Sequence, residues 1–268
     1  MVTGPGRATQ ASRPEMAAVL ATFEQLDDWG SRVQNAFSPP AGSELARDDA
    51  VFPWLATADI AWQGLCAAQD HLKAFRSWLR HEPPELFPIA TFSLLRGALV
   101  GGALATWVLV SDSVDERTSR SLAVAADWYR NHLNYGQTIA PIAMDEQKHA
   151  AQLDHIRSRA KEVKALRAGL PKANFKMTAV IKTANDQLWP GDEARALQTM
   201  ALWQAGSGDA HALGWSILAR NHDMTPLDDG MGAFVGIPSD LDVADAYLCA
   251  YDFVAYGFYR LDELSQVR

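Results

Sequence analysis

Cysteine is scarce in this sequence: Cys66 and Cys249 are the two thiols in 268 residues, and they lie far apart in apolar surroundings. Two thiols in a chain of this length do not make the disulfide framework of a small secreted protein. Residues 1–13 are polar, rich in glycine, threonine and serine, and contain no apolar stretch that could act as a secretory signal. We therefore expect a protein of the reducing cytoplasm whose first 13 residues form a disordered tail.

Motifs for nucleotide or metal chemistry are missing as well. No glycine-rich phosphate loop or dinucleotide fingerprint occurs, and the seven histidines are scattered without the spacing of a zinc site. A di-iron bundle requires two Glu-x-x-His pairs, whereas the sequence has one, from Glu146 to His149. We interpret that pair as part of a solvated helix face. The sequence thus predicts no cofactor and no metal, and it leaves open whether the protein is an enzyme.

Strict alternation of apolar and polar residues is also absent, so a β-sheet of any size is not expected. Apolar residues instead recur at helical spacing, and at 48% of the chain they are numerous enough to fill a core. We predict an all-α, multi-helix bundle of about seven to nine helices that forms a single domain over residues 14–268. The predicted helices cover residues 14–37, 54–80, 87–110, 113–136, 141–169, 173–188 and 192–205, followed by a helix ending near 220, a long loop at 222–238 that folds over the bundle, and a last helix capped by Ser239.

One segment is apolar enough to be tested as a membrane span. Residues 86–110 carry a single charge, Arg96, and a guanidinium near the middle of a span costs about 2.5–3.5 kcal/mol on insertion scales. A buried core helix is the better interpretation, and we expect no membrane partner. Gly97, Gly101 and Gly102 lie inside this helix, where each glycine costs about 1 kcal/mol relative to alanine. We therefore expect another helix to cross closely at these glycines.

Charge is unevenly distributed although the net charge is −8. Basic residues dominate between residues 157 and 182, and acidic residues dominate after Asp223. This asymmetry indicates either an anionic partner or two faces that attract each other within the fold or within a dimer. The predicted helix over residues 141–169 has a thin apolar stripe, which suits packing on one neighbour or in a homo-oligomer. The candidate phosphate-binding side chains are Arg157, Arg159, Lys161, Lys164, Arg167, Lys172 and Lys176.

One match occurs to the ribonuclease motif of the HEPN helical family, an arginine followed four to six residues later by a histidine. It runs from Arg76 to His81. The histidine would move a proton and the guanidinium would hold a phosphate. The motif is short enough that one match in this sequence is expected by chance.

Two polar groups stand in apolar surroundings. Ser207 and His211, four residues apart among glycines, could place both side chains on one side of a helix start and form a nucleophilic pair. The competing interpretation is that Ser207 is a helix N-cap and His211 a buried, hydrogen-bonded histidine. Arg96 is predicted to be buried and to require carboxylate partners. The candidate partners are Asp59, Asp70 and Asp127.

Four short motifs occur in a familiar order: Ala67–Leu72, Leu94–Arg96 with Trp107, Glu116–Arg117 with Arg120, and Ser207 with His211 before Gly214. Over about residues 60–220 the sequence resembles a group of uncharacterised all-helical proteins from actinobacteria. Val100 stands where that group usually has a glutamate, four residues after the arginine. The resemblance implies an all-α fold and no known activity. It also implies a shared site built from Asp70, His71, Arg96, Ser207 and His211.

We therefore expect a cytoplasmic helical binding or interaction module that self-associates. One alternative is a HEPN-like ribonuclease of toxin or phage-defence type, and another is nucleic-acid binding through residues 157–182. The candidate catalytic residues are His211, Ser207, Arg96, Asp70 and His71.

Overall fold

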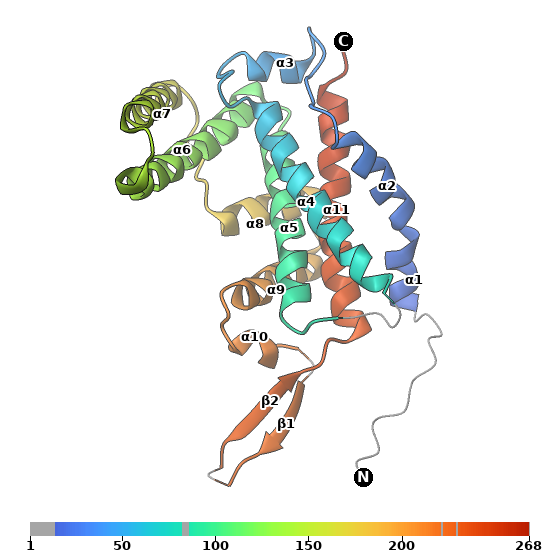
Figure 1. Cartoon of the computed structure of the whole chain (residues 1–268). Helices are drawn as coiled ribbons and strands as arrows, with labels where there is room; N and C mark the ends of the chain where they lie inside the picture. Colours follow the sequence, from blue (N-terminus) through green and yellow to red (C-terminus); the bar gives the residue numbers. More distant parts are fainter. Residues whose placement is uncertain (1–13, 82–85, 221, 229, 268) are drawn as a thin grey trace.

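Three long helices lie side by side at the centre of the molecule (Figure 1). The computed structural model describes residues 14–81, 86–220, 222–228 and 230–267. The predicted N-terminal tail lies outside these described residues. The central helices are α4 (Thr57–Leu79), α5 (Ala90–Leu109) and α11 (Asp240–Leu264).

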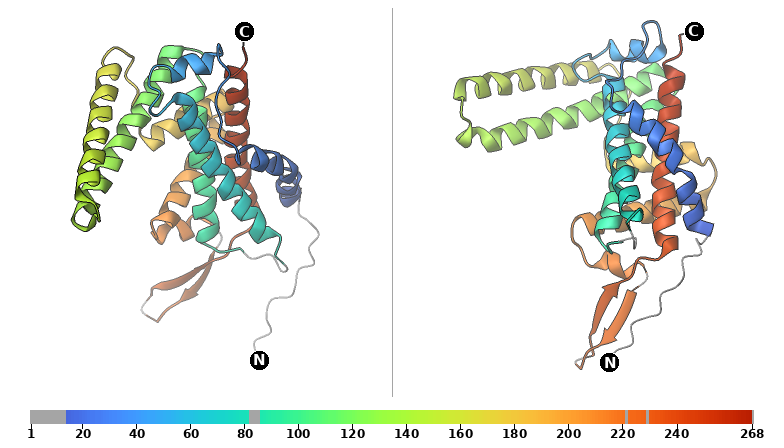
Figure 2. Two further views of the ribbon diagram at one scale, coloured as in Figure 1. Left: turned by 45° about the horizontal axis from the view of Figure 1, so that its top comes forward. Right: turned by 45° about the vertical axis from the view of Figure 1, so that its right-hand side comes forward.

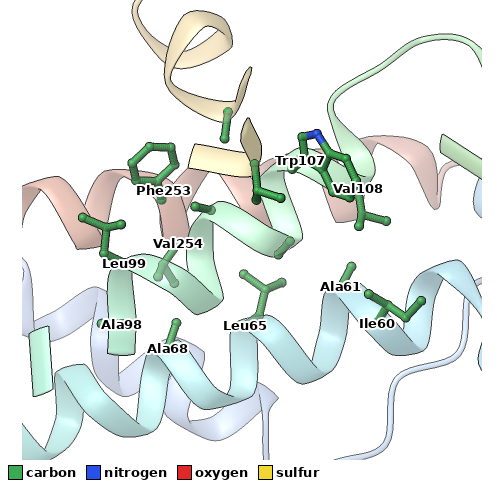
Figure 3. Packing of buried hydrophobic residues seen from close by; sticks show 14 of the residues in the cluster. Ile60, Ala61, Leu65, Ala68, Ala98, Leu99, Trp107, Val108, Phe253 and Val254 are labelled. Atoms are coloured by element: carbon green, nitrogen blue, oxygen red, sulfur yellow. The ribbon is translucent and has the colours of Figure 1, made fainter. Parts of the chain in front are cut away.

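Helix α5 is the core helix of the bundle and packs against both α4 and α11. Figure 3 shows the apolar side chains that meet there, among them Leu65 of α4, Leu99 of α5 and Phe253 of α11. By length and composition α5 would pass as a membrane span, but 67% of its apolar window is buried inside the bundle. This placement agrees with the buried core helix predicted for residues 86–110.

Glycines let the central helices touch backbone to backbone. A Cβ atom on Gly101 of α5 would lie 2.5 Å from the carbonyl oxygen of Gly64 in α4. A Cβ atom on Gly102 would lie 3.0 Å from the backbone nitrogen of Val254 in α11. The prediction that another helix crosses closely at the α5 glycines is therefore confirmed.

The N-terminal part of the chain is divided more finely than predicted. Helices α1 (Pro14–Ala21) and α2 (Phe23–Arg32) replace the single helix expected over residues 14–37. The division falls at Thr22, whose hydroxyl donates to the carbonyl of Val19 (2.7 Å) and also contacts the hydroxyl of Tyr247 (2.6 Å). Such side-chain bonding to the preceding turn competes with helix continuation.

The short helix α3 (Glu44–Asp49) was not predicted, and a buried ion pair holds it in place. The side chains of Arg117 and Asp48 are both 0% exposed, and Arg117 Nε donates to Asp48 Oδ2 at 2.6 Å. Arg117 also donates to the carbonyl of Ser111 at 2.8 Å. Because an unpaired buried charge is costly, this pair ties α3 to the start of the helix that carries Arg117.

A helical hairpin projects sideways from the bundle, away from α4 and α5 (Figure 2). We call residues 127–167 the arm. Its second helix packs mainly on its first, as the thin apolar stripe predicts. The arm is formed by the second half of α6 (Val114–Ile139), the 3₁₀ helix η1 (Ala140–Ile142) and α7 (Glu146–Arg167).

The predicted end of α6 at Gly136 was wrong, and so was the predicted start of the next helix at Pro141. Gly136 lies inside α6, where a Cβ atom would come within 2.6 Å of Leu153 Cδ2 in α7. The glycine therefore serves close packing within the arm and does not stop the helix. Asp145 caps α7 through its carboxylate, which accepts from the backbone N–H of Lys148 at 2.9 Å.

At the end of the molecule opposite the arm, the structure again differs from the prediction. Residues 222–238 were predicted as a loop folded over the bundle, but residues 222–226 and 232–236 pair as the strands of an antiparallel β-hairpin that extends away from it (Figures 1 and 2). Gly230, with φ +79°, lies between the two strands, and the other glycines and the prolines that made the segment look irregular lie in and beside the strands. The elements here are α8 (Met177–Leu188), α9 (Glu193–Ala210), α10 (Trp215–Leu218), β1 (His222–Pro226) and β2 (Gly232–Gly236).

The all-α fold class is confirmed, since the hairpin is the only sheet in the described residues. The helices are slightly more numerous than predicted because the first one is divided and α3 was missed. The predicted caps at Ser113 and Ser239 are confirmed. The Ser113 hydroxyl accepts from the N–H of Glu116 (3.4 Å), and the Ser239 hydroxyl accepts from the N–H of Asp242 (3.1 Å).

Replacing Gly101 with alanine is expected to lower the free energy of unfolding by about 2 kcal/mol, because the new methyl group would force α4 and α5 apart. Urea unfolding followed by circular dichroism measures this change. Gly214→Ala is the control, since nothing lies within 4 Å of a Cβ atom there. Equal stability of the two variants would contradict the backbone contact.

Asp49 is expected to make stability depend on pH. Its carboxylate accepts from the N–H of Ala58 at 2.8 Å, and burial raises its pKa to about 6. Because this pKa is higher in the folded than in the unfolded chain, the stabilising contribution is present below about pH 4 and is lost as the pH rises through about 6.

Asp49→Asn removes this titration while keeping an oxygen that can accept from Ala58. We expect the variant to match the wild type at about pH 4 and to exceed its free energy of unfolding by about 1–2 kcal/mol at about pH 7.5, after allowance for solvent screening. Urea unfolding at both pH values measures the difference. A difference that does not change with pH would contradict this role.

Candidate functional site

Only some of the predicted site residues lie close together in the structure. Arg96 of α5 donates from Nε to the hydroxyl of Ser207 in α9, over 2.9 Å. Gly206 allows this approach, since a Cβ atom there would lie 2.8 Å from the Cβ of Arg96. The sequence pattern thus identified two residues that do meet, although they are 111 positions apart.

The carboxylate partners predicted for Arg96 were wrong. Asp59 accepts from the N–H of Ala56 at the start of α4, and Asp127 pairs with Arg130 along α6. Asp70 is exposed on α4. Arg96 is half-buried, not fully buried, and α9 approaches closely enough to offer it a hydroxyl in place of a carboxylate.

His71 lies against the backbone of α5. Its ring occupies the space over Gly97, where a Cβ atom would come within 2.4 Å of His71 Nε2. Burial lowers the pKa of His71, and the neighbouring charge of Asp70 opposes that shift only in part. The imidazole is therefore neutral at pH 7 and can both donate and accept one hydrogen bond.

Ser207 and His211 do not form the arrangement of an N-cap and a buried histidine, so that interpretation was wrong. Helix α9 continues without a break through Ser207 to Ala210, and the Ser207 hydroxyl donates to the carbonyl of Trp203 at 2.8 Å. His211 follows the helix as its C-cap and is exposed. The nucleophilic pairing finds no support either, because the Ser207 hydroxyl is already bonded to Arg96 and Trp203.

A buried polar cluster beside this region was missed. The side chain of Asp209 is 0% exposed, forms an ion pair with Arg220 and accepts from the Ser216 hydroxyl at 2.7 Å. The Arg220 guanidinium lies 3.6 Å from the ring centroid of Phe92 and donates to the carbonyl of Pro88 at 3.2 Å. All the partners are protein groups, so the cluster fastens α10 to α9 and to the start of α5.

The basic side chains predicted to hold phosphate differ in their surroundings: the arginines make local contacts, and the lysines are exposed. Arg157 and Arg159 form ion pairs with Asp154 and Glu162 on α7 itself, and Arg167 donates to the carbonyl of Ala173. The lysines point into solvent. They are Lys161, Lys164, Lys172 and Lys176.

A crevice of about 370 Å³ lies between α4, α5 and the base of α6. Arg96 and His71 both line it, together with Gln63 and apolar side chains. A second hollow of about 510 Å³ follows α6 into the arm and shares Val124 and Trp128 with the first. Among the residues that the structure describes, no three His, Cys, Asp or Glu side chains gather as a metal centre would require.

The β-hairpin, α10 and the residues beside them carry many exposed apolar side chains. Most side chains of both strands are exposed, with Val235 at 63% and Met231 at 66%. No sequence pattern points to this surface, because the glycines and prolines of the segment predict a loop. Its exposed apolar residues are Leu213, Trp215, Leu218, Met224, Leu227, Met231, Phe234, Val235 and Ile237.

Asp209→Asn is expected to lower the free energy of unfolding by about 3 kcal/mol, because it leaves the Arg220 charge without its buried partner. Asp154→Asn removes an exposed ion pair with Arg157 and should change stability by less than about 0.5 kcal/mol. Urea unfolding measures both variants. Similar small losses would show that the Asp209 pair does not fasten α10.

Comparisons with known proteins assign neither a family nor a function to this chain. No protein-family model matches the chain, and no curated protein or solved structure matches it significantly.

Proposed function

We propose that this protein is a helical interaction module that self-associates through its β-hairpin. The observation that carries this proposal is the exposed, apolar two-stranded sheet at the end of the bundle opposite the arm (Figure 1). An isolated two-stranded hairpin is marginally stable in water, and unpaired strand edges invite further strands. A surface of this kind is costly unless a partner covers it.

The two edges of the hairpin differ in chemistry. Strand β1 carries Asp223 and Pro226, and proline has no N–H to donate to a neighbouring strand. Strand β2 reads Gly-Ala-Phe-Val-Gly over residues 232–236, without charge or proline. Because charges and prolines are the devices that protect sheet edges, β2 is the edge suited to pairing.

The sequence of β2 suits pairing with a second copy of itself. Around Phe234 the residues are nearly symmetric, with alanine and valine on either side and glycines beyond. Two antiparallel copies centred on Phe234 would place Ala233 opposite Val235 of the partner strand, free of like-charge contacts. Such a contact is isologous, and it closes as a two-fold dimer with a four-stranded sheet.

Residues around the strands would extend this interface. Helix α10 packs near the base of β2, where Ile217 lies within 3.2 Å of the position a Cβ atom would take on Gly236. Trp215 and Leu218 of α10 are each about half exposed. Burying these side chains with Phe234 would supply the apolar centre that stable interfaces require.

The two alternatives from the sequence stay predictions, and no contact favours either. In the ribonuclease motif, Arg76 donates to the Asp27 carboxylate (2.6 Å) and to the carbonyl of Phe23 (3.0 Å), so its guanidinium is already occupied. For nucleic-acid binding, Arg157 and Arg159 of α7 are engaged in ion pairs on the same helix, whereas the lysines are exposed.

The test is the molar mass of the full chain across a concentration series, measured by size-exclusion chromatography with light scattering. We expect a dimer for the wild type. Phe234→Asp should weaken the dimer at least about tenfold, because it puts two carboxylates face to face at the centre of the pairing.

Met144→Asp is the matched control, since it places the same charge on another exposed apolar residue, in the arm. It should leave the dimer intact. A strict monomer at high wild-type concentration would contradict the proposal. A dimer that dissociates in Met144→Asp and persists in Phe234→Asp would also contradict it, because the subunits would then meet at the arm.

A further inference from the structure

The crevice between α4, α5 and α6 has three glycines in its wall. Gly64 and Gly101 lie where α4 and α5 cross at backbone distance, and Gly97 lies under the His71 ring. The crevice volume of about 370 Å³ falls within the range of small-molecule sites.

The crevice has a polar end and an apolar end. Helices α4 and α5 pack with Gly97 beside His71 and with Gly101 beside Gly64. Arg96 and His71 therefore lie near one end, and Leu104 lies two turns of α5 further along. At 1.5 Å per residue this separation is about 12 Å, the reach of a medium-length alkyl chain.

An apolar hollow continues from the far end of the crevice. Trp128 lines both the crevice and this second hollow, which follows α6 into the arm and is also lined by Tyr135 and Phe175. Trp128 is 41% exposed and Tyr135 62% exposed. Large aromatic side chains gain much by burial, so a ligand with an apolar body would be stabilised along this path.

The polar end is suited to an anion. The Nε of Arg96 is held by Ser207, which fixes the direction of the side chain, and no carboxylate pairs with this guanidinium among the described residues. A guanidinium offers parallel N–H donors that match a carboxylate. The neutral His71 ring and the Gln63 amide add polar atoms without negative charge.

From these features we propose that the crevice binds a medium-chain alkyl carboxylate. The carboxylate lies on Arg96, and the alkyl chain runs past the α5 glycines towards Leu104 and Trp128. This site lies between α4, α5 and α6 and does not involve the hairpin, so it is independent of the self-association proposed above.

The experiment is a calorimetric titration of the full chain with sodium decanoate and, separately, with decyltrimethylammonium, which has the same alkyl length and the opposite charge. We expect decanoate to bind at least tenfold more tightly. Arg96→Gln should weaken decanoate binding at least tenfold and leave the weaker binding of decyltrimethylammonium unchanged. Lys73→Gln is the charge-matched control, since Lys73 is exposed on α4 outside the crevice. This variant should bind decanoate as the wild type does.

Equal affinity for the two amphiphiles, no decanoate binding, or an unchanged affinity in Arg96→Gln would each overturn the proposal. If Arg96→Gln does not fold, Leu104→Trp decides the question, because it fills the apolar end and leaves Arg96 in place. Decanoate affinity should then fall at least tenfold, and retained affinity would place the ligand elsewhere.

Discussion

The fold depends on one contact, the backbone approach of α4 and α5 at Gly64 and Gly101. At this crossing there is no side chain to hold the helices apart, so α5 comes close enough to α4 to be covered on one side. On the other side Gly102 meets the backbone of α11, and Gly257 of α11 lies where a Cβ atom would contact Leu65 at 2.9 Å. Helix propensity is lost at each glycine, and the gain in packed apolar surface outweighs it.

The crevice lies beside the same contact. Gly64, Gly97 and Gly101 form part of its wall, and the neighbouring helix fills the positions that their side chains would take. Arg96 and His71 border the crevice because their own neighbours, Ser207 and Gly97, hold them at its edge. Contacts within the bundle thus hold the polar end of the crevice in place.

Two parts of the molecule lie outside the packing of α4, α5 and α11. The arm is held mainly by contacts between α6 and α7, and the hairpin touches the bundle near Gly236 and α10 (Figure 2). Both expose apolar residues, with Tyr135, Ile142 and Met144 on the arm and Phe234 on the hairpin. Elements of low local stability that present apolar surface are where binding is expected, since a partner supplies the burial that the chain itself does not.

Most of the helical architecture could be predicted from the sequence because periodicity, caps and interior glycines are local signals. Ser113 and Ser239 cap the helices that they were expected to cap, and the α5 glycines marked a real crossing. Long-range pairing left no such signal. Arg117 and Asp48 are 69 residues apart, and the choice of Ser207 as the partner of Arg96 depends on how closely α9 approaches α5.

The hairpin and the end of α6 were mispredicted for a related reason. Glycine and proline in a sequence indicate a turn, but in these two places they serve packing and the protection of an edge. Gly136 accommodates Leu153, and Pro226 occupies a strand. Which role a glycine or proline has is decided by a neighbour from elsewhere in the chain, so the local sequence does not reveal it.

The central claim is that stability resides in the glycine-mediated packing of α4, α5 and α11, with the arm and the hairpin as weakly held extensions. Native-state hydrogen exchange of the Phe234→Asp variant, in which the proposed dimer is disrupted, tests this directly. Amides at residues 60–72, 95–108 and 243–261 should exchange slowest, and those at 146–167 and 222–236 at least about a hundredfold faster. Equal protection of the arm, the hairpin and the central helices would contradict the account.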